Sequence, residues 1–151
     1  MIQAAASYRE FPPRRELRTY VRALFTFSVP AAMDVTRRPL AREVLFGPGE
    51  EYSSALFADG HVSLAFSFGP GYRVEGLWEP RRSGPHGHVI GAIPSARRAT
   101  HGNSLVQVGA YFHAGHSNLF LPALARELTG RILPLADLWG AAASAWEVRL
   151  A

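Results

Sequence analysis

The sequence predicts a mainly β fold with C-terminal helices: a small β-barrel or sandwich followed by two or three helices. Three observations support this prediction. Short apolar stretches between residues 42 and 113 are separated by Gly, Pro and Asp turns, a spacing typical of all-β folds. After residue 117 the apolar residues recur at helical spacing instead. The length of 151 residues fits one domain, 1–151.

The composition excludes several classes of protein. With 48% hydrophobic and 19% charged residues, the chain is globular rather than intrinsically disordered. It has no cysteine, which excludes a disulfide scaffold, a thiolate zinc site and a cysteine nucleophile. No apolar run approaches the ~20 residues that span a bilayer, and residues 1–10 lack the apolar core of a secretory signal. We therefore expect a cytoplasmic protein without membrane contacts.

The charge balance does not indicate nucleic-acid binding by this chain. The net charge is +4, yet all 16 basic residues are arginine and none is lysine, which points to a codon bias rather than to a selected surface. The arginines are also dispersed along the sequence, whereas a nucleic-acid footprint is a continuous basic stripe with a reading element. We interpret them as a solvated surface.

The first zone, residues 1–30, is predicted to contain an extended segment, a short helix and a strand. Residues 8–13 are expected to be extended, because proline disfavours the helical conformation in the residue before it. Residues 14–22 carry apolar side chains at helical spacing and could form one or two turns. The aromatic content of residues 23–29 then predicts a strand.

The second zone, residues 42–113, is predicted to be the β-barrel. Asp59-Gly60 is a strong hairpin signal. After it, large apolar residues alternate with a second face made of His61, Ser63, Ala65 and Ser67. Residues 79–87 read as a loop rich in Pro, Gly and His. The other strands are expected at 44–46, 52–57, 72–78, 88–93, 97–101 and 105–113.

The third zone, residues 117–151, is predicted to be helical. Pro122 fits the first position of a helix that Gly130 would end. A last helix is expected to open at Pro134, because apolar residues recur at helical spacing up to Leu150. This pattern continues to the end of the sequence without a Gly or Pro stop, which favours a longer native chain.

Four stretches carry a resemblance to a known family. They are Tyr8-Arg9-Glu10-Phe11-Pro12-Pro13 with Leu17-Arg18 and Tyr20-Val21; Asp59-Gly60 with the strand to Phe68; Val89-Ile90-Gly91; and the tail with Val108-Gly109, Phe112, Gly115, Leu128-Thr129, Arg131, Pro134-Leu135 and Asp137-Leu138-Trp139-Gly140. In order and spacing they resemble the N-terminal, cupin-like sensor domain of bacterial AraC-type transcriptional regulators. The resemblance covers nearly the whole chain. It implies an effector-sensing and dimerisation domain whose DNA-binding half, two helix-turn-helix units, is absent from these residues.

The sequence departs from the family pattern at the centre of the predicted barrel. The family pattern has a small or sulfur residue, an acidic residue and an asparagine along the strand after Asp59-Gly60, where this chain has His61, Ser63 and Ser67. An arginine-proline pair after Phe112 is replaced by His113-Ala114. If the acidic and amide groups hold a ligand in relatives, this protein binds a different molecule or has lost the site.

The candidate ligand-binding residues lie in the predicted barrel. Small barrels are either filled by side chains or hold one small ligand, and the face with His61, Ser63 and Ser67 is small and polar. The sequence leaves open whether this face points to the interior or to solvent. Trp78, Arg98 and Tyr111 are further candidates for an apolar pocket with a few polar groups.

The sequence does not favour an enzyme. It has no Gly-x-Ser-x-Gly elbow and no phosphate-binding loop, so no catalytic residue, cofactor or metal is assigned. His86 and His88 form an HxH pair, but no carboxylate follows until Glu127. We interpret His86 as a surface residue of the loop and His113 and His116 as capping or exposed. The alternative is a stand-alone cupin-like metalloenzyme using His61, His86, His88 or His113.

The C-terminal helix could provide a partner surface. Its apolar residues could pack on the barrel or pair with a second chain, and the family resemblance favours a two-fold homodimer. A further alternative is a solitary dimerisation module that titrates a full-length regulator. The expected partners are thus an unknown small-molecule effector and a second copy, with DNA contacted only through a separate domain. The interface candidates are Leu138, Trp139, Ala142, Trp146 and Leu150.

Overall fold

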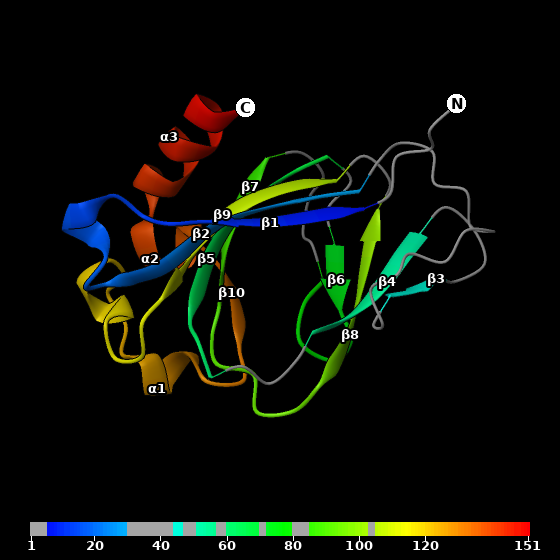
Figure 1. Cartoon of the computed structure of the whole chain (residues 1–151), viewed down its shortest axis with the longest axis horizontal. Coiled ribbons are helices and arrows are strands. Elements are labelled where there is room, and N and C mark those ends of the chain that lie inside the picture. Colours follow the sequence, from blue (N-terminus) through cyan, green and yellow to red (C-terminus); the bar gives the residue numbers. More distant parts are fainter. Residues whose placement is uncertain are drawn as a thin grey trace.

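The computed structural model describes residues 6–29, 44–46, 51–56, 60–69, 72–79, 85–102 and 105–151, with the backbone alone for 44–46, 51 and 52. It confirms a mainly β fold followed by a few C-terminal helices (Figure 1). In the described residues the strands form two antiparallel sheets. The predicted turns at 47–49 and 70–71, together with Asp59, Asn103 and the loop residues 80–84, lie outside the described residues.

The larger sheet has six strands in the order β1-β2-β9-β5-β7-β10. The pairing of β2 with β9 joins segments that are far apart in the sequence, since Val21 lies opposite Phe112. The bounds are Ser7–Phe11 for β1, Val21–Ser28 for β2, Val106–Phe112 for β9, Ser63–Phe68 for β5, His86–Ile90 for β7 and Ile132–Pro134 for β10.

The smaller sheet has four strands in the order β3-β4-β8-β6. It packs on one face of the larger sheet through a core cluster that includes Tyr72, Val74 and Ala99 from the small sheet and Ile132 from the large one. Its strands are Val44–Phe46 for β3, Glu51–Leu56 for β4, Arg97–Gly102 for β8 and Tyr72–Val74 for β6.

The helices cover part of the opposite, outer face of the large sheet. Figure 1 shows α3 rising from this face near β7. A second core cluster joins Phe66 and Val89 of the strands to Leu135 and Ala143 of the helical segment. The helices are short because glycine interrupts them: Gly140, with φ of +56°, separates the last two. Their bounds are Ala125–Leu128 for α1, Ala136–Trp139 for α2 and Ala141–Leu150 for α3.

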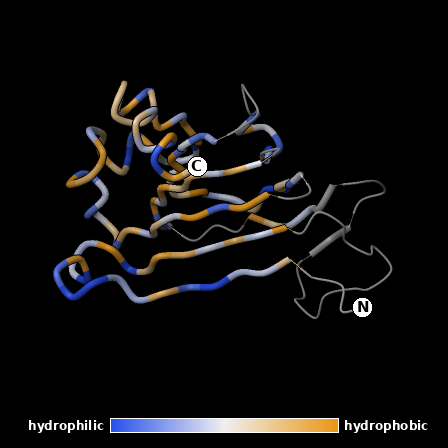
Figure 2. The backbone as a smooth tube through the Cα atoms, turned by 90° about the horizontal axis from the view of Figure 1, so that it is seen from above, coloured by the Kyte–Doolittle hydropathy of each residue, from blue (hydrophilic) through white to orange (hydrophobic). Residues whose placement is uncertain are grey.

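The edge strand β1 differs from its neighbour in polarity. Figure 2 shows a largely hydrophilic trace through β1 and the turn after it, which contains a 3-10 helix at Arg15–Leu17. Every residue of β1 is exposed, whereas β2 alternates between buried and exposed residues along its first half. Residues 6–29, the described part of the predicted zone 1–30, thus contain a strand, a short helical turn and a second strand.

Two sequence-based boundaries were wrong. The barrel region does not stop at 42–113, because β1, β2 and β10 are strands of the large sheet. The region 117–151 is not entirely helical: Pro134 ends β10, where it lies opposite His88, and the helix begins at Ala136. Helical periodicity cannot reveal a three-residue edge strand, since such a strand is too short to show a period of its own.

Within the described residues, no helix is both long and apolar enough to cross a membrane.

Candidate functional site

The small, polar face of β5 points to the interior between the sheets. Ser63, Ala65 and Ser67 are all buried, with Ser67 completely inaccessible. The Oγ atom of Ser67 accepts a hydrogen bond of 2.9 Å from Nε2 of Gln107 on β9. The large residues of β5 point to the other face, where Phe66 belongs to the helix-covered core. The question that the sequence left open is thereby decided in favour of the interior.

Five aromatic side chains meet in this interior, and we call them the ring cluster: Tyr72, Trp78, His86, His88 and His101. The His88 ring lies 5.0 Å from Tyr72, 5.7 Å from Trp78 and 5.7 Å from His86 between ring centroids. Tyr72 stacks on His101 at 5.6 Å. The cluster joins β7 of the large sheet to β6 and β8 of the small one, so it lies between the two layers.

Several polar atoms of the ring cluster are buried without a hydrogen bond. Within the part of the chain that the structure describes, these include Oη of Tyr72, Nε1 of Trp78 and both ring nitrogens of His88. By contrast, Nε2 of His101 lies 3.0 Å from Oγ of Ser54. Buried polar groups nearly always have a partner, and leaving one unpaired costs roughly 1–3 kcal/mol. The unpaired atoms therefore mark a place where a bound molecule or water would be stabilised.

His88 and His101 of the ring cluster are neutral at pH 7. Burial, reinforced by the neighbouring His86, lowers the pKa of His88 to about 3. Burial also lowers the pKa of His101 to about 4. The same desolvation raises the pKa of Tyr72 above its ordinary value. These three rings thus offer hydrogen-bond donors and acceptors but no formal charge.

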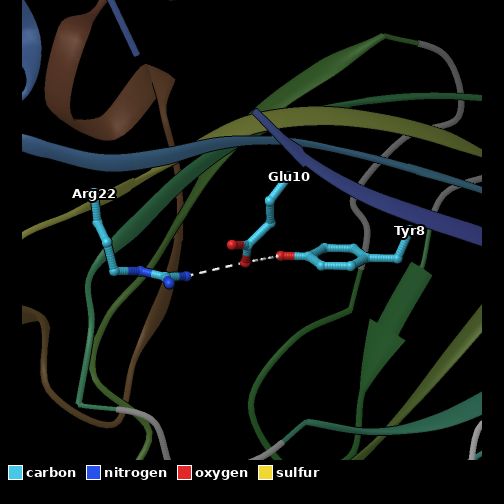
Figure 3. Close-up of polar contacts among 3 residues, drawn as sticks. All are labelled: Tyr8, Glu10 and Arg22. Carbon is cyan, nitrogen blue, oxygen red and sulfur yellow. Dashed lines mark hydrogen bonds and ion pairs between the residues drawn. The ribbon is translucent and has the colours of Figure 1, made fainter. Parts of the chain in front are cut away.

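A second group of polar residues, the rim cluster, comes from β1, β2 and β9 and consists of Tyr8, Glu10, Arg22 and Tyr111. Oη of Tyr8 donates to Oε1 of Glu10 at 2.6 Å, and Nη2 of Arg22 donates to the same oxygen at 3.1 Å (Figure 3). The Arg22 guanidinium lies 4.9 Å from the centre of the Tyr111 ring. Hydrogen bonding from Tyr8 lowers the pKa of Glu10, and burial together with that bond raises the pKa of Tyr8. The rim cluster therefore contains charged side chains, whereas Tyr72, His88 and His101 of the ring cluster are neutral.

The outer face of the large sheet carries a groove of about 390 Å³. Its walls are almost entirely apolar, with Thr26 as the polar side chain. The groove lies on the face opposite the ring cluster. It is lined by Phe11, Leu24, Phe25, Thr26, Leu64, Phe66, Val108, Gly109 and Ala110.

Of the six ligand-binding residues predicted from sequence, Trp78 belongs to the ring cluster and the other five lie outside it. Ser63 and Ser67 face the interior, and Trp78 stacks against His86 at 6.3 Å. Tyr111 lies in the rim cluster, and His61 is half-buried two residues before the start of β5. Arg98 does not belong to the site. It is exposed on β8, whose inward residues are Ala99 and His101.

Sequence reasoning missed Tyr72, His86, His88 and His101 as ligand-binding residues, because it considered His86 and His88 only for the metalloenzyme alternative. The interpretation of His86 as a surface residue was wrong, because it opens β7 and is 7% exposed. The two-residue spacing of His86 and His88 was the available signal, since it places both rings on one face of a strand. The Pro and Gly residues around the pair concealed the strand.

The metalloenzyme alternative needs ligands among His61, His86, His88 and His113, and the structure does not bring all four side chains close together. His113 lies at the other end of the strands from His86, and its Nε2 is 3.1 Å from the carbonyl oxygen of Arg18. The ring of His116 is 3.1 Å from the carbonyl oxygen of Ala114. Among the described residues, no group of three or more His, Asp or Glu side chains is placed to hold a metal ion.

The five candidate interface residues fall into two groups. Leu138 and Trp139 pack against the helix-covered core, and Nε1 of Trp139 donates to the carbonyl oxygen of Phe120 at 2.9 Å. Ala142, Trp146 and Leu150 instead form an exposed stripe along α3, at i, i+4 and i+8. The stripe is available to a partner, whereas the first two residues serve the fold of this chain.

No protein-family model, no curated protein and no solved structure matches the chain. The similarity to AraC-type regulators therefore stays a prediction from the sequence.

Proposed function

We propose that this chain is the effector-sensing and dimerisation domain of an AraC-like transcriptional regulator, which binds a small molecule between its two sheets. The ring cluster carries the proposal. It gathers aromatic faces and unpaired polar atoms of Tyr72, Trp78 and His88 in one buried place. An apolar site with a few convergent polar groups is the usual chemistry of small-molecule recognition. The proposal assigns no reaction to the chain.

The chemistry of the ring cluster favours an uncharged, planar ligand that bears hydrogen-bond acceptors. Nε1 of Trp78 can only donate, and neutral His88 offers one donor and one acceptor. With the pKa of His88 at about 3, that ring supplies no positive charge to a buried anion at pH 7. Burying a charge without a partner is far more costly than burying a neutral polar group.

Control of transcription would follow from a shift in conformational populations. An effector that binds one arrangement of the domain better than another favours that arrangement by its differential affinity. The two-fold homodimer would use the exposed stripe of Ala142, Trp146 and Leu150. DNA would be contacted by a helix-turn-helix domain that is not among these residues.

Ligand binding is tested by thermal-shift screening of metabolite pools, followed by calorimetry. A ligand at 100 times its Kd should stabilise the fold by about 2.7 kcal/mol. Benzamide, benzoate and benzylamine form a matched set of neutral, anionic and cationic probes, of which benzamide should bind most tightly. His88→Gln and Trp78→Phe should weaken binding, while Arg98→Gln on the exposed face of β8 should not. If no compound from any pool and none of the three probes binds, the proposed function is overturned.

A further inference from the structure

Strand β7 separates the ring cluster from the helices. His86 and His88 point to the interior, where their rings lie 5.7 Å apart. Gly87, between them, points to the outer face, as the alternation of a strand requires. A Cβ atom at Gly87 would lie 2.8 Å from Cδ2 of Leu135 and 3.0 Å from Cε1 of Phe66. The backbone between the two histidines is therefore in close contact with the helical segment.

The hydrogen bonds of Gly87 show how this contact is made. An antiparallel pair normally exchanges two backbone hydrogen bonds, and here the N–H of Leu135 does donate to the carbonyl oxygen of Gly87 at 2.9 Å. The carbonyl of Leu135 cannot complete the pair, because it accepts from the N–H groups of Leu138 and Trp139 at the start of α2. The N–H of Gly87 donates instead to Oε1 of Glu147, at 2.8 Å.

At this edge of the sheet, the side chain of Glu147 on α3 thus accepts the hydrogen bond that the carbonyl oxygen of a neighbouring strand would normally accept. It is 6% exposed and shares the buried side of the helix with Ala143, four residues earlier. A bond from an amide to a carboxylate is shorter and stronger than one between neutral groups. The stripe of Ala142, Trp146 and Leu150 lies on the same helix, so one bond joins this stripe to the strand that carries the histidines.

We propose that Glu147 is a positioning residue that couples the ring cluster to α3. A molecule that displaces His86 or His88 moves the backbone at Gly87, and the bond to Glu147 passes this movement to the helix. Coupling is reciprocal, so the position of α3 also changes affinity in the interior. This inference rests on the proposed function, of which it describes the regulation.

Two substitutions distinguish the hydrogen bond from the buried charge. Glu147→Gln keeps the length of the side chain and an acceptor oxygen, whereas Glu147→Asp keeps the charge but is one methylene too short. We expect amide hydrogen exchange at Gly87 to accelerate by about tenfold or more in Glu147→Asp and by less than about twofold in Glu147→Gln. Equal protection of Gly87 in both variants and the parent chain would overturn the proposal.

The coupling itself is measured in both directions by NMR. Glu147→Asp should shift the ring signals of His86 and His88, which lie on the other side of the strand. In return, His88→Gln should change amide exchange along residues 141–150, and this effect should vanish in the double variant with Glu147→Asp. Val148→Gln, at a position of α3 that is 78% exposed, is the matched control and should leave the histidine signals unchanged. If the exchange at Gly87 responds but the histidines do not, the bond holds the helix without coupling it, and the proposal fails.

Both variants of Glu147 preserve most of the side chain, and circular dichroism checks that each is folded. No ligand is needed in these measurements. A negative result therefore overturns the coupling alone, while a negative ligand screen overturns the proposed function.

Discussion

At the scale of single residues, His88 is the most informative side chain of the molecule. It is fully buried, its ring contacts Tyr72, Trp78 and His86, and neither nitrogen has a hydrogen-bond partner among the described residues. A core position selected for stability alone would hold a leucine or phenylalanine there at lower cost. The unpaired ring nitrogens of His88 therefore support the recognition role that we propose for the ring cluster.

The burial of His88 predicts a loss of stability in acid. An unfolded histidine takes up a proton near pH 6.5, whereas folded His88 does so only near pH 3. Below about pH 6.5 the unfolded state binds the extra proton, so the free energy of unfolding falls as the pH falls. Between pH 7 and pH 5 this residue should contribute a loss of about 2 kcal/mol. Urea unfolding of the parent chain and His88→Gln at both pH values measures the difference.

The control for this experiment is Trp78→Phe, which alters the packing of the same cluster without removing a titrating group. It should lower the unfolding free energy by a similar amount at pH 7 and pH 5. If His88→Gln retains the full pH dependence of the parent chain, His88 is not held neutral in the folded state.

At the scale of the elements, the sequence predicted strands well and their ends poorly. The turn residues and the alternation of large and small side chains located β5, β8 and β9, because successive side chains of a strand point to opposite faces and give a period of two. Elements that depend on distant partners were missed or misplaced. β10 exists because Ile132–Pro134 pairs with β7, and β7 begins at His86 because its Pro- and Gly-rich start is held between β5 and the helices.

The chain after β7 lies so close to the end of α1 that adding a single methyl group at Gly91 should strongly destabilise the fold. A Cβ atom at Gly91 would lie 1.7 Å from the carbonyl oxygen of Leu128, so the backbone of one element would have to shift. We expect Gly91→Ala to cost more than about 3 kcal/mol of unfolding free energy. Denaturant unfolding measures this loss.

Gly115→Ala is the comparison for that variant. Gly115 has φ of +79°, but a Cβ atom added there would meet nothing within 4 Å beyond its neighbours in the chain. The expected loss is therefore about 1–2 kcal/mol, from backbone strain alone. Equal losses at the two positions would mean that α1 moves away from β7 without difficulty.

At the scale of the whole molecule, the large sheet has two different faces. One holds the ring cluster beneath the small sheet, and the other holds the apolar core beneath the helices. The sequence indicated a small polar face on β5 but could not assign it to the interior. That assignment depends on the second sheet, and no local pattern encodes which face another sheet will cover.

The exposed stripe of α3 predicts the behaviour of the proposed homodimer. Trp146 is 41% exposed, and aromatic residues at the centre of an interface commonly contribute about 2 kcal/mol or more. Trp146→Glu should therefore weaken self-association by at least about tenfold, as measured by sedimentation equilibrium. Val148→Glu, on another side of the helix, should leave it unchanged. A parent chain that is monomeric at high concentration would contradict this prediction.

The strand order of the large sheet also determines when each strand can pair during synthesis on the ribosome. β2 leaves the exit tunnel early, yet its neighbour β9 is completed only when Phe112 has been made. β7 must wait longer, for Ile132–Pro134 and then for Glu147. Until these partners have been made, the nascent chain exposes unpaired strand edges, which are the surfaces most prone to aggregation. Chains stalled before residue 132 are expected to be chaperone clients, and only the last helix completes the sheet.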